Sequence, residues 1–239
     1  MMNLKELLSP WIQKDIPELE INDMSNDSRQ VKEGGLFLAY PGTVTDGRQY
    51  IELALQQGAR AVLYDPEGWH RPQSDMEKCC FPFPKLAKNL SHIANRFYDD
   101  PSQRVYLTGV TGTNGKTTIA YQLAQAHQAL DSSAMYIGTL GYGRVQHLQP
   151  LANTTPDALC VNKLLHESVL MQVQEVCMEV SSHALAQNRV QGLHFEQATD
   201  CGWLIPQAEI LGLIKILATS GCCTANWRRP SMPLRSPSR

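Results

Sequence analysis

The stretch LTGVTGTNGKTTIAYQLAQAH, residues 107–127, joins an apolar run to a helical pattern through a loop rich in glycine and threonine. Gly112 and Gly115 allow the backbone to turn its N–H groups toward an anion, because no Cβ blocks the approach. The helix behind the loop adds unpaired N–H donors and a partial positive charge. Strand, loop and helix in this order predict a phosphate-binding loop in an α/β protein.

The loop differs from the general phosphate-loop spacing G-x-x-x-x-G-K-[ST], because counting back five residues from Gly115 reaches Val110. A glycine-rich turn without a ligand is therefore the alternative interpretation. Lys116 and Thr117 at the start of the helix favour the phosphate site. The ammonium group would neutralise phosphate oxygens, and the hydroxyl is placed to bind Mg²⁺.

The bulk composition describes a folded globular protein. The chain has 239 residues, of which 43% are hydrophobic and 18% charged, and its formal net charge is −2. This balance argues against a nucleic-acid partner, which normally requires a basic excess. Residues 1–20 lack the basic-then-apolar layout of a signal peptide, and no run reaches the roughly 18 apolar residues of a membrane span. We expect a cytoplasmic protein with no membrane partner.

The seven cysteines form no C-x-x-C pair and show no zinc-ligand spacing. An odd number that includes two adjacent pairs fits reduced thiols better than a disulfide framework. We therefore assign the cysteines no chemistry.

Strand-like and helical segments alternate along the chain. Strands are expected over residues 34–40, 60–65, 104–110, 133–138 and 174–180. Helices are expected over 46–59 with Asp46 as cap, between 85 and 99, over 116–130, and from Thr155 as N-cap with Pro156 at the first helical position. Repeated alternation implies parallel sheets covered on both faces. We expect an N-terminal domain over residues 1–100 and a central domain over residues 101–199.

A second chemistry-bearing stretch is CMEVSSHAL, residues 177–185. An acid at the carboxyl end of a parallel strand lies where α/β sheets bind ligands, so Glu179 could hold a metal ion near the phosphates. His183 follows in the next turn. The alternative, given equal weight on spacing alone, is a carboxylate facing a helix dipole and a surface histidine. Ser181 and Ser182 are natural helix N-caps.

Four stretches, in the same order over residues 20–198, resemble the Mur ligase family of peptidoglycan synthesis, most closely its members that add the third amino acid of the peptide. They read DSRQVKEGGLFLAYPGTVTDGR, GVTGTNGKTT, NTTPDA and MEVSSHALAQNRV. The phosphate loop of the family is written T-G-T-N-G-K-T-T, which accounts for Val110. So extended a match is more specific than any single loop motif.

The resemblance implies roles for individual residues. ATP would bind Thr111, Gly112, Thr113, Asn114, Gly115, Lys116 and Thr117. The UDP-N-acetylmuramoyl-peptide substrate would contact Asn26, Ser28, Thr43, Val44, Thr45, Asn153, Thr154, Thr155, Ser181, Gln187 and Arg189. Thr117 and Glu179 would hold Mg²⁺, with His183 near a second metal ion. The implied catalytic set is Lys116, Glu179 and His183.

The resemblance also implies a fold and a reaction. A small α/β domain that binds the uridine nucleotide would precede a partial P-loop-type central domain with a parallel sheet. The glutamate carboxylate of UDP-MurNAc-L-Ala-D-Glu would attack the γ-phosphorus of ATP and form an acyl phosphate, which the amine of a free amino acid then converts to an amide. Lys116 and Mg²⁺ would offset the repulsion between the two anions. We expect a monomer.

The end of the chain departs from the family pattern. After LHFEQAT the family continues with a segment like F-T-N-L-x-x-D-H-L-D-Y-H, whereas residues 200–212 read DCGWLIPQAEILG. We expect residues 200–239 to be an aberrant tail outside the fold, produced by a frameshift near residue 199. Reading the other frames of the encoding DNA tests this hypothesis, and finding no D-H-L-D-Y-H-like segment there would overturn it.

Two alternatives remain open. Folylpolyglutamate synthase uses the same acyl-phosphate logic, but it usually has K-G-S after the loop glycine and lacks the uridine-binding domain. The chain could also be a binding-only or inert product, because a sheet cut short exposes an edge. We expect no turnover by this chain alone; phosphate release with the UDP-dipeptide and candidate amino acids would contradict that expectation. The residues do not specify the third amino acid.

Overall fold

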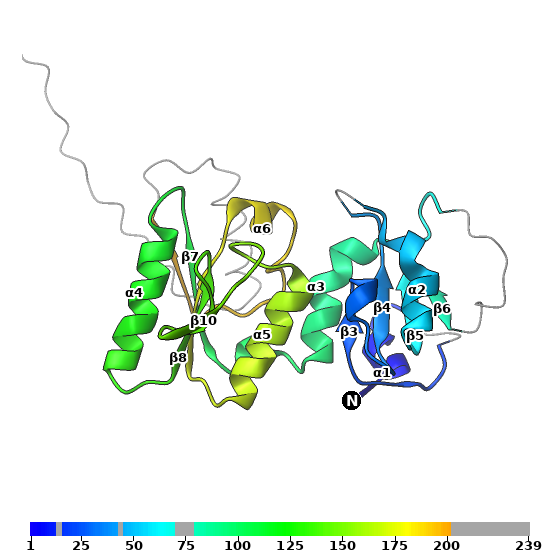
Figure 1. Cartoon of the computed structure of the whole chain (residues 1–239), viewed down its shortest axis with the longest axis horizontal. Helices are drawn as coiled ribbons and strands as arrows, with labels where there is room; N and C mark the ends of the chain where they lie inside the picture. Colours follow the sequence, from blue (N-terminus) through cyan, green and yellow to red (C-terminus); the bar gives the residue numbers. More distant parts are fainter. Residues whose placement is uncertain (13–15, 43–44, 70–78, 202–239) are drawn as a thin grey trace, which may run out of the picture.

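The computed structural model describes residues 1–12, 16–42, 45–69 and 79–201. The two halves of this part of the chain each contain a parallel sheet flanked by helices (Figure 1). The elements of the first half are β1 (Met2–Asn3), α1 (Leu4–Leu8), β2 (Glu20–Ile21), β3 (Met24–Ser25), the 3₁₀ helix η1 (Ser28–Gln30), β4 (Leu36–Ala39), the 3₁₀ helix η2 (Gly47–Tyr50), α2 (Ile51–Gln56), β5 (Ala61–Tyr64), β6 (Cys80–Pro82) and α3 (Leu86–Phe97). Those of the second half are the 3₁₀ helix η4 (Pro101–Gln103), β7 (Tyr106–Thr111), α4 (Lys116–Ala129), β8 (Ala134–Gly138), β9 (Gly141–Arg144), β10 (His147–Gln149), α5 (Ala158–Leu170), β11 (Glu175–Glu179), α6 (Ser182–Ala186) and β12 (Gln197–Asp200).

The first sheet has the order β3-β4-β5-β6, and all its neighbouring strands are parallel. All four residues of β4 are buried, because successive side chains point to opposite faces and both faces are covered. Leu36 and Leu38 join the cluster formed with α1 and α3. Phe37 and Ala39 join the cluster formed with α2. The continuous apolar run in the sequence therefore reflects helices on both sides of the strand.

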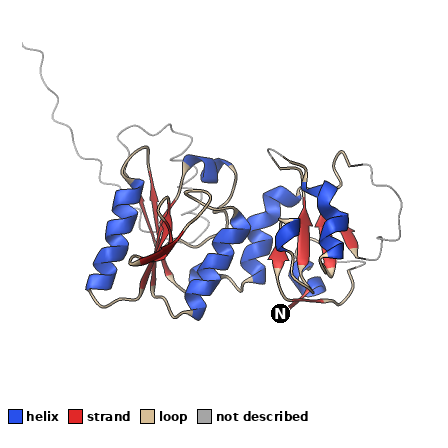
Figure 2. Ribbon diagram, in the orientation of Figure 1, coloured by secondary structure: helices blue, strands red, loops and turns tan. Residues whose placement is uncertain are grey.

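The second sheet has the order β10-β9-β8-β11-β7-β12. Strands β8, β11, β7 and β12 are parallel, and β9 and β10 extend the sheet as an antiparallel hairpin. Helix α4 lies on one side of the sheet and α5 on the other (Figure 2). Along β11, Val176 and Met178 pack in the cluster that includes α5, while Cys177 packs in the cluster that includes α4.

The structure confirms the parallel α/β class and corrects the start of the helix after Asn153. Its N-cap is Asp157, whose carboxylate accepts hydrogen bonds from the N–H groups of Leu159 and Cys160, each at 3.0 Å. The prediction that Thr155 is the N-cap was wrong, because its hydroxyl instead donates to the carbonyl oxygen of Glu179 at 2.9 Å. A buried long-range hydrogen bond thus takes the side chain that local sequence assigns to the cap.

Two further features differ from the sequence interpretation. The expected helix over 46–59 begins at Asp46 as predicted, but its first turn is the 3₁₀ helix η2, and α2 follows. The hairpin of β9 and β10 was not predicted. The expected tail lies outside the described residues, apart from Asp200 in β12 and Cys201. Cys222 and Cys223 also lie outside them, and the five cysteines that the structure describes are not joined in disulfide bonds.

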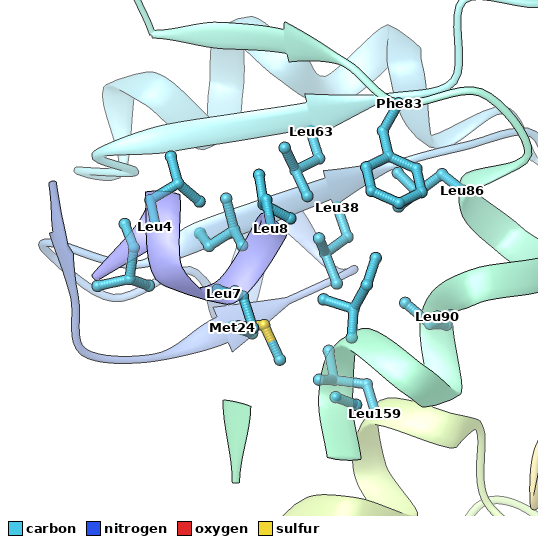
Figure 3. Packing of buried hydrophobic residues seen from close by; sticks show 14 of the residues in the cluster. Leu4, Leu7, Leu8, Met24, Leu38, Leu63, Phe83, Leu86, Leu90 and Leu159 are labelled. Carbon is cyan, nitrogen blue, oxygen red and sulfur yellow. The ribbon is translucent and has the colours of Figure 1, made fainter. Parts of the chain in front are cut away.

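The two halves meet along α3 and α5. The predicted face of α3 is confirmed, since Leu86, Leu90 and Ile93 are buried in the first cluster and Phe97 packs against it. Leu159 of α5 belongs to the same cluster as Leu90 (Figure 3). The side chains of α5 therefore contact the core of the first half as well as the second sheet.

Candidate active site

The glycine-rich loop connects the carboxyl end of β7 with the first turn of α4. Gly112 and Gly115 have φ values of 126° and 82°, which residues other than glycine rarely adopt. Gly115 is the N-cap of α4 and has no side chain to cap the helix. The first N–H groups of α4 therefore face the loop without a side-chain hydrogen-bond acceptor. The ammonium group of Lys116 donates to the carbonyl oxygen of Gly112 at 2.7 Å. This arrangement can bind a phosphate through backbone N–H groups and the lysine.

Glu179 ends β11, the strand adjacent to β7, and its side chain is fully buried. The Thr117 hydroxyl donates to Oε2 of Glu179 at 2.9 Å. Both oxygens are hard ligands of the kind that Mg²⁺ prefers, so this donor set fits the expected metal ion. Thr117 and Glu179 would hold it beside the phosphate loop.

Strand β8 supplies further partners for the same carboxylate. The Thr139 N–H donates to Oε1 of Glu179 at 2.8 Å, and the Thr139 hydroxyl lies 3.3 Å from Oε2. The Tyr136 hydroxyl also donates to Oε1. Burial raises the pKa of Tyr136, and its hydrogen bond with Glu179 raises that pKa further, so the phenol is protonated. A buried carboxylate is thus surrounded by donors, as burial of a charge requires.

His183 lies in α6 with its side chain exposed. In the described part of the chain it makes no hydrogen bond with Thr117 or Glu179, and no group of three or more His, Cys, Asp or Glu side chains is placed to hold a metal ion. Among the described residues, a hydrogen bond therefore joins Thr117 to Glu179, and none joins His183 to either of them. Its role near a second metal ion stays a prediction.

The loop of residues 153–155 reaches the same edge of the sheet. The Thr139 hydroxyl lies 3.1 Å from the Thr154 hydroxyl, and the Thr155 hydroxyl accepts from the Ser181 N–H at 3.0 Å. Arg189 donates to the carbonyl oxygen of Thr155 at 2.6 Å and, through a second guanidinium nitrogen, to the Gln187 amide oxygen at 2.7 Å. Thr154 is therefore linked to Thr139, while hydrogen bonds link Thr155 to Ser181 and to Arg189, and Arg189 to Gln187.

Four of the residues expected to contact the UDP-substrate line two neighbouring hollows. One of about 490 Å³ includes Asn26, Ser28 and Thr45 in its wall. The other, of about 370 Å³, is lined from both halves of the chain and includes Asn26 and Asn153. Asn26 thus connects the two hollows, and its amide donates to the Tyr40 hydroxyl at 3.0 Å. Thr43 and Val44 lie outside the described residues.

Sequence reasoning missed Tyr136 and Thr139. Both belong to the segment YIGT at the carboxyl end of β8, the other neighbour of β11. Because the carboxyl ends of adjacent parallel strands share one edge of the sheet, this segment could have been included once β8 was expected.

Two models of protein families match the chain, one in each half. Residues 20–98 match the Mur ligase family, catalytic domain, and residues 110–199 match the Mur ligase middle domain. The chain belongs to the Mur ligase family.

Several curated relatives carry the same name, UDP-N-acetylmuramoyl-L-alanyl-D-glutamate--2,6-diaminopimelate ligase. The protein of Coxiella burnetii is 40% identical over 195 residues, which cover 82% of this chain and 40% of the relative. That of Vibrio vulnificus is 43% identical over 202 residues, covering 81% and 40%. That of Pseudomonas putida is 45% identical over 179 residues, covering 74% and 36%. The chain thus spans about two fifths of the length of these relatives.

Solved structures show the same fold. A structure of a UDP-N-acetylmuramoyl-L-alanyl-D-glutamate--2,6-diaminopimelate ligase aligns with a TM-score of 0.72 at 24% identity, covering 90% of this chain and 45% of the other. MurF from Acinetobacter baumannii aligns with a TM-score of 0.59 at 17% identity, covering 91% and 45%. Among the described residues, no helix has the length and apolar character needed to cross a membrane.

Proposed function

We propose that this chain supplies the substrate-binding and ATP-binding parts of an ATP-dependent ligase that joins 2,6-diaminopimelate to UDP-N-acetylmuramoyl-L-alanyl-D-glutamate. The name shared by the curated relatives supports the substrates. We assign residues 1–100 to a domain that binds the UDP-substrate and residues 101–199 to a domain that binds ATP. The reaction is the two-step amide synthesis through an acyl phosphate that the family resemblance implies.

One observation carries the proposal: the Thr117 hydroxyl at the start of α4 lies 2.9 Å from the buried carboxylate of Glu179. This pair places two oxygen ligands beside a loop built to receive a phosphate. A structural turn has no need of a fully buried carboxylate at that position, since moving a charge out of water is costly and here requires several donors to offset it.

Within the proposed reaction, the chain's own residues bind and orient. Lys116 and the N–H groups of the loop would bind the terminal phosphates of ATP, and Thr117 and Glu179 would hold Mg²⁺. Bound Mg²⁺ supplies positive charge that offsets the charge of the phosphate oxygens. Thr154 lies against Thr139, which contacts Glu179, so a substrate held by the loop of residues 153–155 would lie next to the phosphates.

The remaining predicted residues would orient the UDP-substrate. Asn26, Ser28 and Thr45 would bind its uridine part in the hollow that they line. Ser181, Gln187 and Arg189 would hold the loop of residues 153–155 through the hydrogen bonds described above. His183 would act at a second metal ion once further ligands are present.

Calorimetric titration tests the proposal. We expect the chain to bind ATP in the presence of Mg²⁺ and, separately, to bind the UDP-dipeptide. Lys116→Ala should weaken ATP binding at least tenfold and leave binding of the UDP-dipeptide unchanged, since a phosphate contact to a charged donor is lost. Lys88→Ala, at an exposed lysine of α3, is the matched control. Failure of the folded chain to bind ATP would overturn the proposal.

The same titration separates the alternative ligase. A folylpolyglutamate-synthase-like protein would bind ATP and a folate but not the UDP-dipeptide. The first hollow, lined by the polar side chains of Asn26, Ser28 and Thr45, favours the UDP-dipeptide.

A further inference from the structure

The two oxygens of the Glu179 carboxylate have different surroundings. Oε1 accepts hydrogen bonds from two donors of the β8 end, the Tyr136 hydroxyl and the Thr139 N–H. Oε2 accepts from the Thr117 hydroxyl at the start of α4, with the Thr139 hydroxyl at 3.3 Å. Oε1 is therefore held by strand β8, and Oε2 faces the phosphate loop.

Tyr136 is fixed in place by its surroundings. Its side chain is fully buried, and its ring packs edge-on against Tyr121 with 5.6 Å between ring centroids. The Leu140 N–H donates to its hydroxyl oxygen at 3.4 Å. A phenol has a single proton, so with the oxygen accepting from Leu140 the proton is directed to Glu179.

Gly138 completes this arrangement. A methyl group built on Gly138 would overlap both Oε1 of Glu179 and the Tyr136 hydroxyl. The backbone of β8 therefore contacts the hydrogen-bonded pair directly, and the carboxylate has no room to turn toward β8 at this point.

We propose that Tyr136 is a positioning residue, which fixes the Glu179 carboxylate so that Oε2 is presented to the metal ion of Mg-ATP. The inference rests on the proposed function, in which Glu179 is a metal ligand. Partners that orient a ligating carboxylate commonly change metal affinity by 10–100-fold when they are removed. Without the hydroxyl, Oε1 keeps only the hydrogen bond from the Thr139 N–H. The carboxylate would then have to be ordered when the metal ion binds, and the cost of that ordering would weaken metal binding.

The test compares Tyr136→Phe with Tyr121→Phe in the whole chain. Tyr121→Phe removes from the neighbouring ring a hydroxyl whose only hydrogen-bond partner among the described residues is the Val145 carbonyl oxygen, at 3.5 Å. ATP binding is titrated at a series of Mg²⁺ concentrations and in EDTA, and Mn²⁺ binding is followed by electron paramagnetic resonance. For Y136F we expect the half-saturating Mg²⁺ concentration to rise roughly tenfold, with ATP binding in EDTA unchanged. Y121F should match the wild type in both.

The outcomes separate this inference from the proposed function. A wild-type chain that binds ATP without any dependence on Mg²⁺ or Mn²⁺ overturns the proposed metal site and this inference together. A metal-dependent wild type with an indistinguishable Y136F overturns the inference alone. So does a Y136F that weakens ATP binding equally in EDTA, since that result indicates a general structural role. If Y136F does not fold, Tyr136→Met fills the space without a hydroxyl and is measured in its place.

Discussion

The Thr117 hydroxyl donates a 2.9 Å hydrogen bond to Oε2 of Glu179, although 62 residues separate them in the sequence. The order of the sheet produces this contact. Strand β11 lies between β8 and β7, so its last residue meets both the β8 end and the helix that follows β7. A carboxylate and a hydroxyl are thereby held beside one phosphate-binding loop.

Thr117→Val should weaken ATP binding in Mg²⁺ about tenfold, because the substitution keeps the side-chain shape but removes one oxygen ligand. Thr118→Val is the matched control, since Thr118 is exposed one residue further along α4. Calorimetry in Mg²⁺ and in EDTA provides the measurement. An equal loss for T117V in both buffers would contradict a metal-binding role for the hydroxyl.

Gly138→Ala should destabilise the protein by about 2–3 kcal/mol, because the added methyl group overlaps Glu179 and the Tyr136 hydroxyl. Gly68→Ala is a demanding control: no heavy atom lies within 4 Å of the added methyl group, but φ is 64°. Its cost should be about 1 kcal/mol, from backbone strain alone. Urea unfolding compares the two variants. A smaller cost at Gly138 than at Gly68 would show that the site relaxes around the methyl group.

Asp46 should make the stability depend on pH. Hydrogen bonds from Arg48, which is 7% exposed, hold the pKa of Asp46 below its ordinary value of 3.8. A lowered pKa in the folded state stabilises the protein above the unfolded-state pKa, and this stabilisation is lost as the pH falls through the folded-state pKa. At pH 6, Asp46→Asn should cost about 1–3 kcal/mol.

The pH comparison uses urea unfolding at pH 6 and pH 3. The difference between wild type and D46N should shrink at pH 3, because pH 3 lies below the unfolded-state pKa, where the stabilisation from the lowered pKa of Asp46 has begun to be lost. Asp131→Asn, at an exposed position, serves as control and should leave stability unchanged at pH 6. A D46N cost that is as large at pH 3 as at pH 6 would contradict the ionic contribution of Asp46.

Local patterns predicted much of the fold. The apolar runs of β4, β5 and β11 are visible in the sequence because these strands are covered on both faces. The spaced apolar residues of α3 are visible because one face of a helix recurs every three to four residues. The hairpin β9–β10 was missed, since its strands are short and Gly141 and Gly143 have φ values of 126° and 127°. Strands this short and rich in glycine show no clear alternation of apolar and polar side chains.

The site was predictable in its parts but not in its connections. The loop and the acid at the strand end follow from local sequence. Tyr136 was not singled out, because its contact with Glu179 joins residues 43 apart and depends on the order of β8 and β11. Thr155 was assigned to a helix cap for the same reason, since its bond to the Glu179 carbonyl oxygen is invisible in a local pattern.

The packing of Leu159 and Ala158 of α5 into the core of the first half has a consequence for unfolding. Helix α5 also covers the second sheet through Val161, Leu164 and Leu165, so its separation from either half exposes apolar surface. The two halves should therefore lose structure in one cooperative transition, with coincident far-ultraviolet circular dichroism and fluorescence curves. Leu159→Ala is the change that should split that transition into two steps.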